Sequence, residues 1–319
     1  MFLTAPNIWL QSWASPALTR TMEVISWFGY TRIAIALAVL VAFGFRLRAG
    51  MALLILLGLN SVAIDVAKTT AGLPRPFAVD PAVRILGWPT PGTTAMAGER
   101  ANATDSEAGF GFPSGHVSTT VTFVAGLAGL AGLNGRRWVR VSGLVWVSLM
   151  AVSRLYLGRH FIADVLGGLA LGGIIVAFGM MALRLSALAH SEATREVERA
   201  ALISALVAAG LLASALVAGR PDIGDTGRLA GMAIAVLLLT RSDMVHLPSR
   251  PLTRAALVTL AAVGYGLVWA ALTFGLPIAG PPASTGRRVA TSALPAFAML
   301  VIPAAIACRR PAALARRDA

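Results

Sequence analysis

Apolar residues along the chain are gathered in long runs, separated by short polar or basic segments. Five runs contain no charged residue and approach the roughly 20 residues that a helix needs to cross the hydrocarbon core: 117–135, 165–183, 200–219, 255–276 and 289–308. Shorter runs next to an Arg or Asp predict further spans at 33–45, 51–64, 141–153 and 229–240. Because lipid offers no partner for an unpaired backbone group, all of these segments should be helical. The pattern predicts an all-α, polytopic membrane bundle of about nine spans.

The composition agrees with a membrane protein. Of the 319 residues, 57% are hydrophobic and only 13% are charged, whereas a typical soluble domain carries about 25% charged residues. This excludes an ordinary soluble protein and a disordered chain, and the single cysteine, Cys308, excludes a disulfide scaffold. The net charge of +13 does not indicate nucleic acid as a partner, because the basic residues are spread between the apolar runs.

The basic residues also predict the orientation of the chain. If nine spans alternate in direction, the larger share of Lys and Arg falls on one side, which should be cytoplasmic and places the amino terminus outside. Trp9, Trp13 and Trp27 predict an interfacial segment at 1–30. The charged connector 191–199 predicts a boundary between a membrane core at 31–190 and carboxyl-terminal membrane helices at 191–319.

Lys68 is the only lysine among the 27 basic residues and lies at the end of a predicted span. A lysine ammonium group is a compact point charge with three donors, so its single use indicates a role that arginine does not fill. Arg75 follows two helical turns later and can project from the same face. Gly72 and Pro74 should end the helix and leave Arg75 on a loop at the membrane surface.

A second polar segment, Pro113-Ser114-Gly115-His116, precedes the apolar run at 117–135. Proline suits the first turn of a helix, and the backbone N–H groups of Ser114 and Gly115 should be free. Free donors and the helix dipole together make such an end an anion site.

A third segment connects two predicted spans. Ser153 and Arg154 end one span, His160 begins the next, and Asp164 lies one helical turn after His160, where its carboxylate can hold an imidazole nitrogen. Taken singly, each segment also fits a structural anchor, turn or ion pair. Successive spans alternate in direction, however, so the polar residues of the three segments should meet at one membrane face. Ionisable residues that share a cavity in a membrane protein are functional by default.

The three segments resemble the signature of the type 2 phosphatidic acid phosphatase (PAP2) superfamily of integral membrane phosphatases. The pattern Kx6RP, PSGH and SRx5HxxxD is present in order and with the expected spacing, at Lys68, Arg75, Pro76, Pro113, Ser114, Gly115, His116, Ser153, Arg154, His160 and Asp164. The resemblance covers roughly 33–185 and implies a PAP2-like core of five spans, followed by four carboxyl-terminal spans of unassigned role.

Phosphoryl transfer depends mainly on positioning the phosphoryl group and neutralising its oxygens. Lys68, Arg75 and Arg154 are therefore the candidate phosphate-binding cations, and the Ser114 hydroxyl and Gly115 N–H are candidate neutral donors. Only one carboxylate belongs to the motifs, so we expect neither a metal nor another cofactor.

The two histidines and the carboxylate are the candidate catalytic residues. His160 would be the nucleophile that forms a phosphohistidine, and Asp164 would fix its tautomer. His116 would protonate the leaving group and then activate water. The resemblance implies the same roles. The start of a helix favours neutral His160 whereas Asp164 favours the protonated form, and the sequence leaves this open.

These features predict a metal-independent phosphatase that acts on a lipid phosphate monoester or diphosphate, of the polyprenyl diphosphate or phosphatidate type. The frequent use of arginine and alanine indicates a bacterial protein of the inner membrane. We expect the site to face the periplasm or exterior, where undecaprenyl diphosphate is an attractive substrate. The alternatives are a sugar-phosphate phosphatase resembling glucose-6-phosphatase, a lipid phosphotransferase and a lipid transporter that has lost turnover. The long segment 77–112 is either a lid over the site or a solvated linker. The predicted partner is the lipid phosphate in the bilayer, and homo-oligomerisation is left open.

Overall fold

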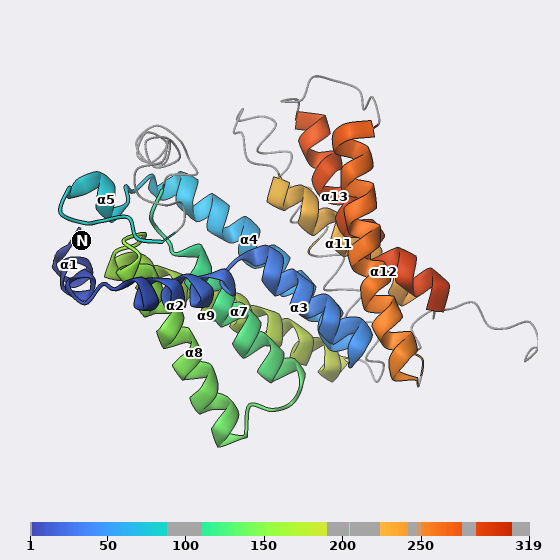
Figure 1. The fold of residues 1–319 in the computed structure, drawn as a ribbon. Coiled ribbons are helices and arrows are strands. Elements are labelled where there is room, and N and C mark those ends of the chain that lie inside the picture. The colour runs from blue at the N-terminus through green and yellow to red at the C-terminus, as the bar shows by residue number, and fades with distance from the viewer. Residues whose placement is uncertain are drawn as a thin grey trace, which may run out of the picture. The chain divides into compact units, whose positions relative to one another are not determined.

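The computed structural model describes residues 2–87, 110–189, 204, 224–241, 248, 250–275 and 285–307. Every regular element in these ranges is a helix, as the hydropathy pattern predicts (Figure 1). In chain order they are α1 (Ala5–Ser12), α2 (Pro16–Trp27), α3 (Thr31–Gly44), α4 (Leu47–Ala71), α5 (Pro76–Val79), α7 (Gly115–Leu130), α8 (Arg137–Tyr156), α9 (Ile162–Ala189), α11 (Gly224–Arg241), α12 (Pro251–Ala270), the π-helical segment η2 (Ala271–Gly275) and α13 (Thr285–Ala307).

Contacts divide the chain into two compact units. The first consists of residues 1–34 and 60–178, and the second of residues 35–59 and 179–319. The first unit contains every candidate site residue. In the second, α11 and α12 both pack on α13, and Gly227 lets α11 approach it so closely that an added Cβ would lie 3.1 Å from the Val289 carbonyl oxygen. The predicted domains 1–30, 31–190 and 191–319 remain a prediction.

Among the described residues, five segments are long and apolar enough to cross a membrane: Leu47–Val79, Arg137–Tyr156, Ile162–Ala182, Pro251–Phe274 and Arg287–Ala307. Together, α2 and α3 form a sixth candidate that is bent by 56°. The count of nine spans is not confirmed. The predicted span 200–219 lies outside the described residues except for residue 204, and α11 carries three charged residues, at 225, 228 and 241.

Two helices end just before a glycine rather than at the end of their apolar run, as predicted for Gly72 but not for Gly132. The span predicted at 51–64 continues through Asp65 and Lys68 to Ala71, and the next residue, Gly72, has φ 59°. The span predicted at 117–135 ends at Leu130, shortly before Gly132 with φ 71°. Only glycine adopts such left-handed angles without strain, so it is the natural residue after the last helical turn.

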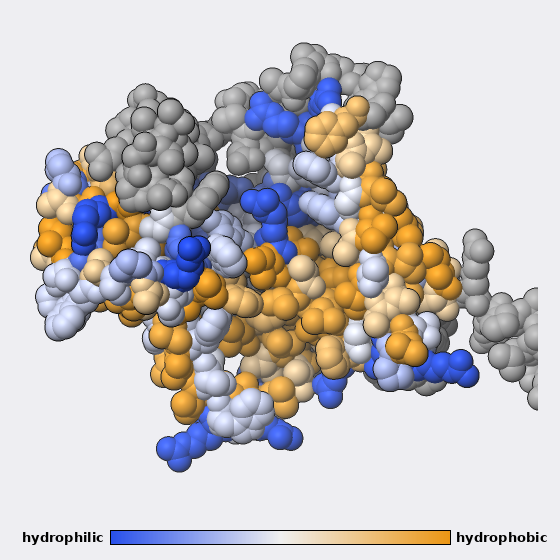
Figure 2. Space-filling model, in the orientation of Figure 1, coloured by the Kyte–Doolittle hydropathy of each residue, from blue (hydrophilic) through white to orange (hydrophobic). Residues whose placement is uncertain are grey.

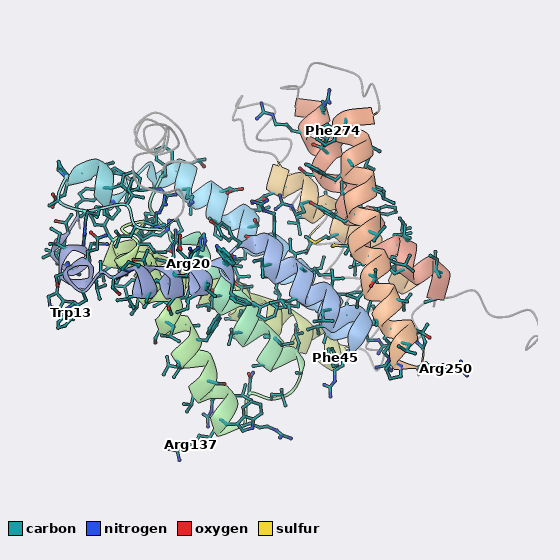
Figure 3. The ribbon with its side chains drawn as sticks, viewed as in Figure 1. Trp13, Arg20, Phe45, Arg137, Arg250 and Phe274 are labelled. Carbon is teal, nitrogen blue, oxygen red and sulfur yellow. The ribbon has the colours of Figure 1, made fainter. Side chains whose placement is uncertain are left out.

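One face of α8 is suited to lipid. Figure 2 shows an orange strip along this helix. Its exposed large apolar residues are Trp138, Val141, Leu144, Val145, Leu149 and Val152. Hydrophilic residues gather at the beginning of this helix, where Figure 3 labels Arg137. Its end is buried instead, at Met150, Ser153, Arg154 and Tyr156. The helix therefore exposes its apolar side and turns its polar end residues into the first unit.

Small residues of α9 allow α7 to approach closely, as expected for helices packed in a membrane. A Cβ added to Gly168 would lie 2.5 Å from the Ser114 carbonyl oxygen, and one added to Gly172 would lie 2.7 Å from the Ser118 carbonyl oxygen. The backbones are thus nearly in contact along this seam. The contact fixes the start of α7, where the Pro-Ser-Gly-His segment lies, against α9.

We expect Gly168→Ala to destabilise the protein by about 1–3 kcal/mol, because the added methyl group meets backbone that cannot move aside. Gly173→Ala is a matched control on the same helix, since nothing lies within 4 Å of its added Cβ. Thermal unfolding of both purified variants in detergent measures the difference. Equal melting temperatures would contradict the close contact between α7 and α9.

Candidate active site

The Pro-Ser-Gly-His segment is held at the start of α7 by the backbone of α9. Ser114 is the N-cap residue of α7, and its N–H donates to the Asp164 carbonyl oxygen at 2.9 Å. The expectation that this N–H is free is therefore wrong, because it docks the segment. The hydroxyl oxygen of Ser114 and Nε2 of His116 are both buried with no hydrogen-bond partner among the described residues. Two such polar atoms in one buried place indicate a site that a polar ligand completes.

The predicted pair of His160 and Asp164 is present. His160 lies just before α9, and its Nδ1 is 3.3 Å from Oδ2 of Asp164, in the first turn of that helix. The same Oδ2 accepts a hydrogen bond from the N–H of Phe161 at 2.8 Å. The carboxylate is thus held by the backbone on one side and faces Nδ1 on the other, which leaves Nε2 of His160 to react.

The environment of His160 favours the neutral imidazole. Burial holds the pKa of His160 well below its usual range, and the positive charges of Arg75, Arg154 and Lys68 act in the same direction. The ring is therefore neutral at neutral pH, as a nucleophile requires. Of the two opposing effects that the sequence left open, the one that favours the neutral ring is therefore the stronger.

The three predicted cations converge on the histidines. Lys68, Arg75 and Arg154 each interact electrostatically with both His116 and His160, although they belong to three separate parts of the chain. Arg75 is the N-cap residue of α5, beyond the glycine that ends α4, as predicted. The site thus combines at least three cations with two imidazoles and one carboxylate, which matches the charge of a bound phosphate.

Hydrogen bonds hold two of these cations in place. Nη1 of Arg75 donates to the carbonyl oxygen of Arg159 at 3.3 Å. Nη1 of Arg154 donates to the hydroxyl of Ser26 in α2 at 2.5 Å. Both guanidinium groups are therefore positioned by parts of the chain other than their own helices.

The sequence analysis missed residues of the turn between α2 and α3. The ring of Tyr30 packs edge-on against His116, with centroids 4.6 Å apart at 64°. A Cβ added to Gly29 would lie 2.7 Å from Cβ and Cδ2 of His116. Arg159 is a further missed residue, because its charge also acts on His116. None of them belongs to a recognisable motif, and the only sequence signal was a glycine between aromatic residues.

Metal binding finds little support in the described part of the chain. No group of three or more His, Cys, Asp or Glu side chains there is placed to hold a metal ion. Whether turnover needs a metal stays a prediction that a chelator tests.

The family comparison covers this site. Residues 49–188 match the family model of the PAP2 superfamily. This matched range, which is less than half of the chain, is similar to a PAP2-superfamily domain and is called the PAP2 domain from here on. No curated protein and no solved structure shows a significant match to the chain. The PAP2 domain contains every signature residue from Lys68 to Asp164 and supports an activity of the phosphatase type. Ser26, Gly29 and Tyr30, which contact its site residues, precede the matched range.

We expect Gly29→Ala to lower turnover by about 10- to 100-fold, because a methyl group at this position displaces His116 and small displacements of catalytic groups are costly. Gly135→Ala is the control, since nothing lies within 4 Å of its added Cβ. Phosphate release by the two purified variants, normalised to folded protein, measures the effect. Wild-type turnover in Gly29→Ala would show that the contact does not constrain His116.

Proposed function

We propose that this protein is a metal-independent membrane phosphatase that hydrolyses a lipid phosphate monoester or diphosphate through a phosphohistidine on His160. The observation that carries the proposal is a buried, neutral imidazole, oriented by Asp164 and surrounded by Lys68, Arg75 and Arg154. The PAP2 domain match supports the same class of reaction.

The first chemical step is transfer of the phosphoryl group to the enzyme. Nε2 of His160 attacks phosphorus with its lone pair, and the bond from phosphorus to the leaving oxygen breaks. His116, whose protonated form the anionic substrate stabilises, gives its proton to that oxygen. The three cations and the Ser114 hydroxyl neutralise the charge that gathers on the other phosphoryl oxygens.

The second step releases phosphate. The now neutral His116 takes a proton from a water molecule, whose oxygen attacks phosphorus as the bond to His160 breaks. Inorganic phosphate leaves with the added oxygen, His160 is neutral again and His116 carries the proton for the next cycle. Asp164 keeps the same nitrogen of His160 available in both steps.

The position of the site residues on their helices supports a lipid substrate. Lys68 and Arg154 lie near the ends of α4 and α8, and His116 and His160 lie at the starts of α7 and α9. In a bundle of alternating helices these ends share one membrane surface. A phosphate head group could bind there while its apolar tail stays in the bilayer. The distribution of basic residues supports the periplasmic face, and a polyprenyl diphosphate such as undecaprenyl diphosphate fits both the location and the charge.

The histidines give the most direct test of the mechanism. We expect no turnover in His160→Ala and none in His116→Ala. With p-nitrophenyl phosphate, whose leaving group needs no proton, His116→Ala should still accumulate a ³²P-labelled enzyme whose label is lost in acid. His190→Ala is the control, because His190 belongs to none of the three motifs. Full activity in His160→Ala would contradict the mechanism.

The substrate is tested by phosphate release from the protein in detergent with EDTA present. We expect activity on polyprenyl diphosphate or phosphatidate and weak activity on glucose 6-phosphate. Preference for the sugar phosphate would favour a sugar-phosphate phosphatase, and label discharged only by an added alcohol would indicate a phosphotransferase. Saturable lipid binding without turnover would favour a transporter, and inhibition by EDTA would contradict the absence of a metal.

A further inference from the structure

We propose that α1 is a positioning element of the active site, in which the carboxamide of Asn7 holds the backbone that carries His160. The proposal rests on the proposed function of His160 as nucleophile. It concerns a helix that precedes the PAP2 domain and contributes no residue to its signature.

Asn7 joins the two ends of residues 155–160, which run from the last turn of α8 to the start of α9 and are called the connection here. Its Nδ2 donates to the carbonyl oxygen of Leu155 at 2.8 Å and to the carbonyl oxygen of His160 at 3.0 Å. Both hydrogens of the amide group are therefore used on backbone acceptors of this connection. Since Asn7 is 0% exposed, water does not replace these bonds.

Gln11 extends the same contact one helical turn later. Its Nε2 donates to the carbonyl oxygen of Tyr156 at 3.0 Å and to that of Arg84 at 2.7 Å, and its Oε1 accepts from the N–H of Arg84 at 2.9 Å. Gly158, with φ 73°, lets the connection pass so close to the Arg84 carbonyl oxygen that no Cβ would fit. The connection is thus fixed between α1 and the segment around residue 84.

The outward face of α1 shows that polar contacts, rather than apolar burial, dock this helix. Trp9 and Trp13 are 64% and 68% exposed, whereas Asn7 and Gln11 are its buried residues. Figure 3 labels Trp13 at the end of α1, and Figure 1 shows this helix beside the end of α8, with which it is in contact. Burying two amides is costly unless they are hydrogen-bonded, so the helix needs these acceptors to stay in place.

The connection held by α1 lies between two residues of the candidate site. Arg154 comes directly before it, His160 ends it, and the N–H of Arg159 closes it on the Arg154 carbonyl oxygen at 3.1 Å. Asp164 orients the ring of His160, and Asn7 holds its main chain. The distance between Nε2 of His160 and the phosphorus atom depends on both contacts. Binding of phosphate by the cations does not depend on this distance, so a shifted His160 should slow attack and leave binding unchanged.

The test compares Asn7→Ala and Asn7→Ser with Ser12→Ala, which removes an exposed hydrogen bond to the Trp9 carbonyl oxygen within the same helix. The full chain in detergent is mixed with p-nitrophenyl phosphate that is saturating and in excess over the enzyme, and the burst of p-nitrophenol gives a first-turnover rate constant that does not depend on the fraction of folded enzyme. The amplitude reports that fraction. Inhibition by inorganic phosphate reports binding without chemistry.

We expect Asn7→Ala to lower the rate constant by about 10- to 100-fold, with inhibition by phosphate changed by less than about threefold. Asn7→Ser, which keeps one donor, should fall between Asn7→Ala and the wild type, and Ser12→Ala should match the wild type. If Asn7→Ala does not fold, Asn7→Ser decides the outcome.

A wild-type rate constant in the Asn7 variants, with or without a smaller amplitude, would overturn the positioning role and leave the proposed function standing. A wild-type protein that forms no phosphoenzyme would overturn the proposed function, and the inference with it.

Discussion

The site depends on Asp164, because this residue connects both histidines. Its carbonyl oxygen accepts the N–H of Ser114 and so docks the segment that carries His116, while its carboxylate faces Nδ1 of His160. One residue in the first turn of α9 therefore sets the positions of the residues proposed as acid and nucleophile. The contact is short enough only because Gly168, one turn further along the same helix, has no side chain. The close packing of α7 on α9 therefore also sets the relative positions of His116 and His160.

The electrostatics of the site are those of a receptor for an anion. The charges of Lys68, Arg75 and Arg154 act on the imidazoles of both His116 and His160. The Ser114 hydroxyl and His116 Nε2 are buried and have no hydrogen-bond partner among the described residues. Like charges held this close repel one another, so the arrangement is most stable when a multiply charged anion lies between them. Burial, and after it the same positive charges, lowers the pKa of His160 and favours the neutral imidazole that the proposed nucleophile needs. Binding and reactivity thus have a common origin.

The sequence predicts the central part of this site but not its surroundings. The alternating direction of the spans was enough to predict that Lys68, His116 and His160 lie at one surface, because this prediction needs only the direction of each helix. The bounds of the spans were less predictable, because hydropathy alone does not show that Gly132 ends its helix. Asn7 and Ser26 could not be found either. Their roles depend on contacts with backbone and side chains more than 100 residues away, and no local pattern records such a partner.

A family domain and a compact unit of structure are different divisions of this chain. The PAP2 match begins at residue 49, within α4, whereas the compact unit that contains the site joins residues 60–178 to residues 1–34. The family signature records the groups proposed to act on phosphate, whose chemistry permits few substitutes. The hydrogen bonds that hold those groups end mostly on backbone carbonyls, as with Asn7 and Gln11, and a backbone acceptor places no demand on the side chain at its position. The donors therefore leave no trace in the side chains of the signature, which is how a positioning element can lie outside the domain it serves.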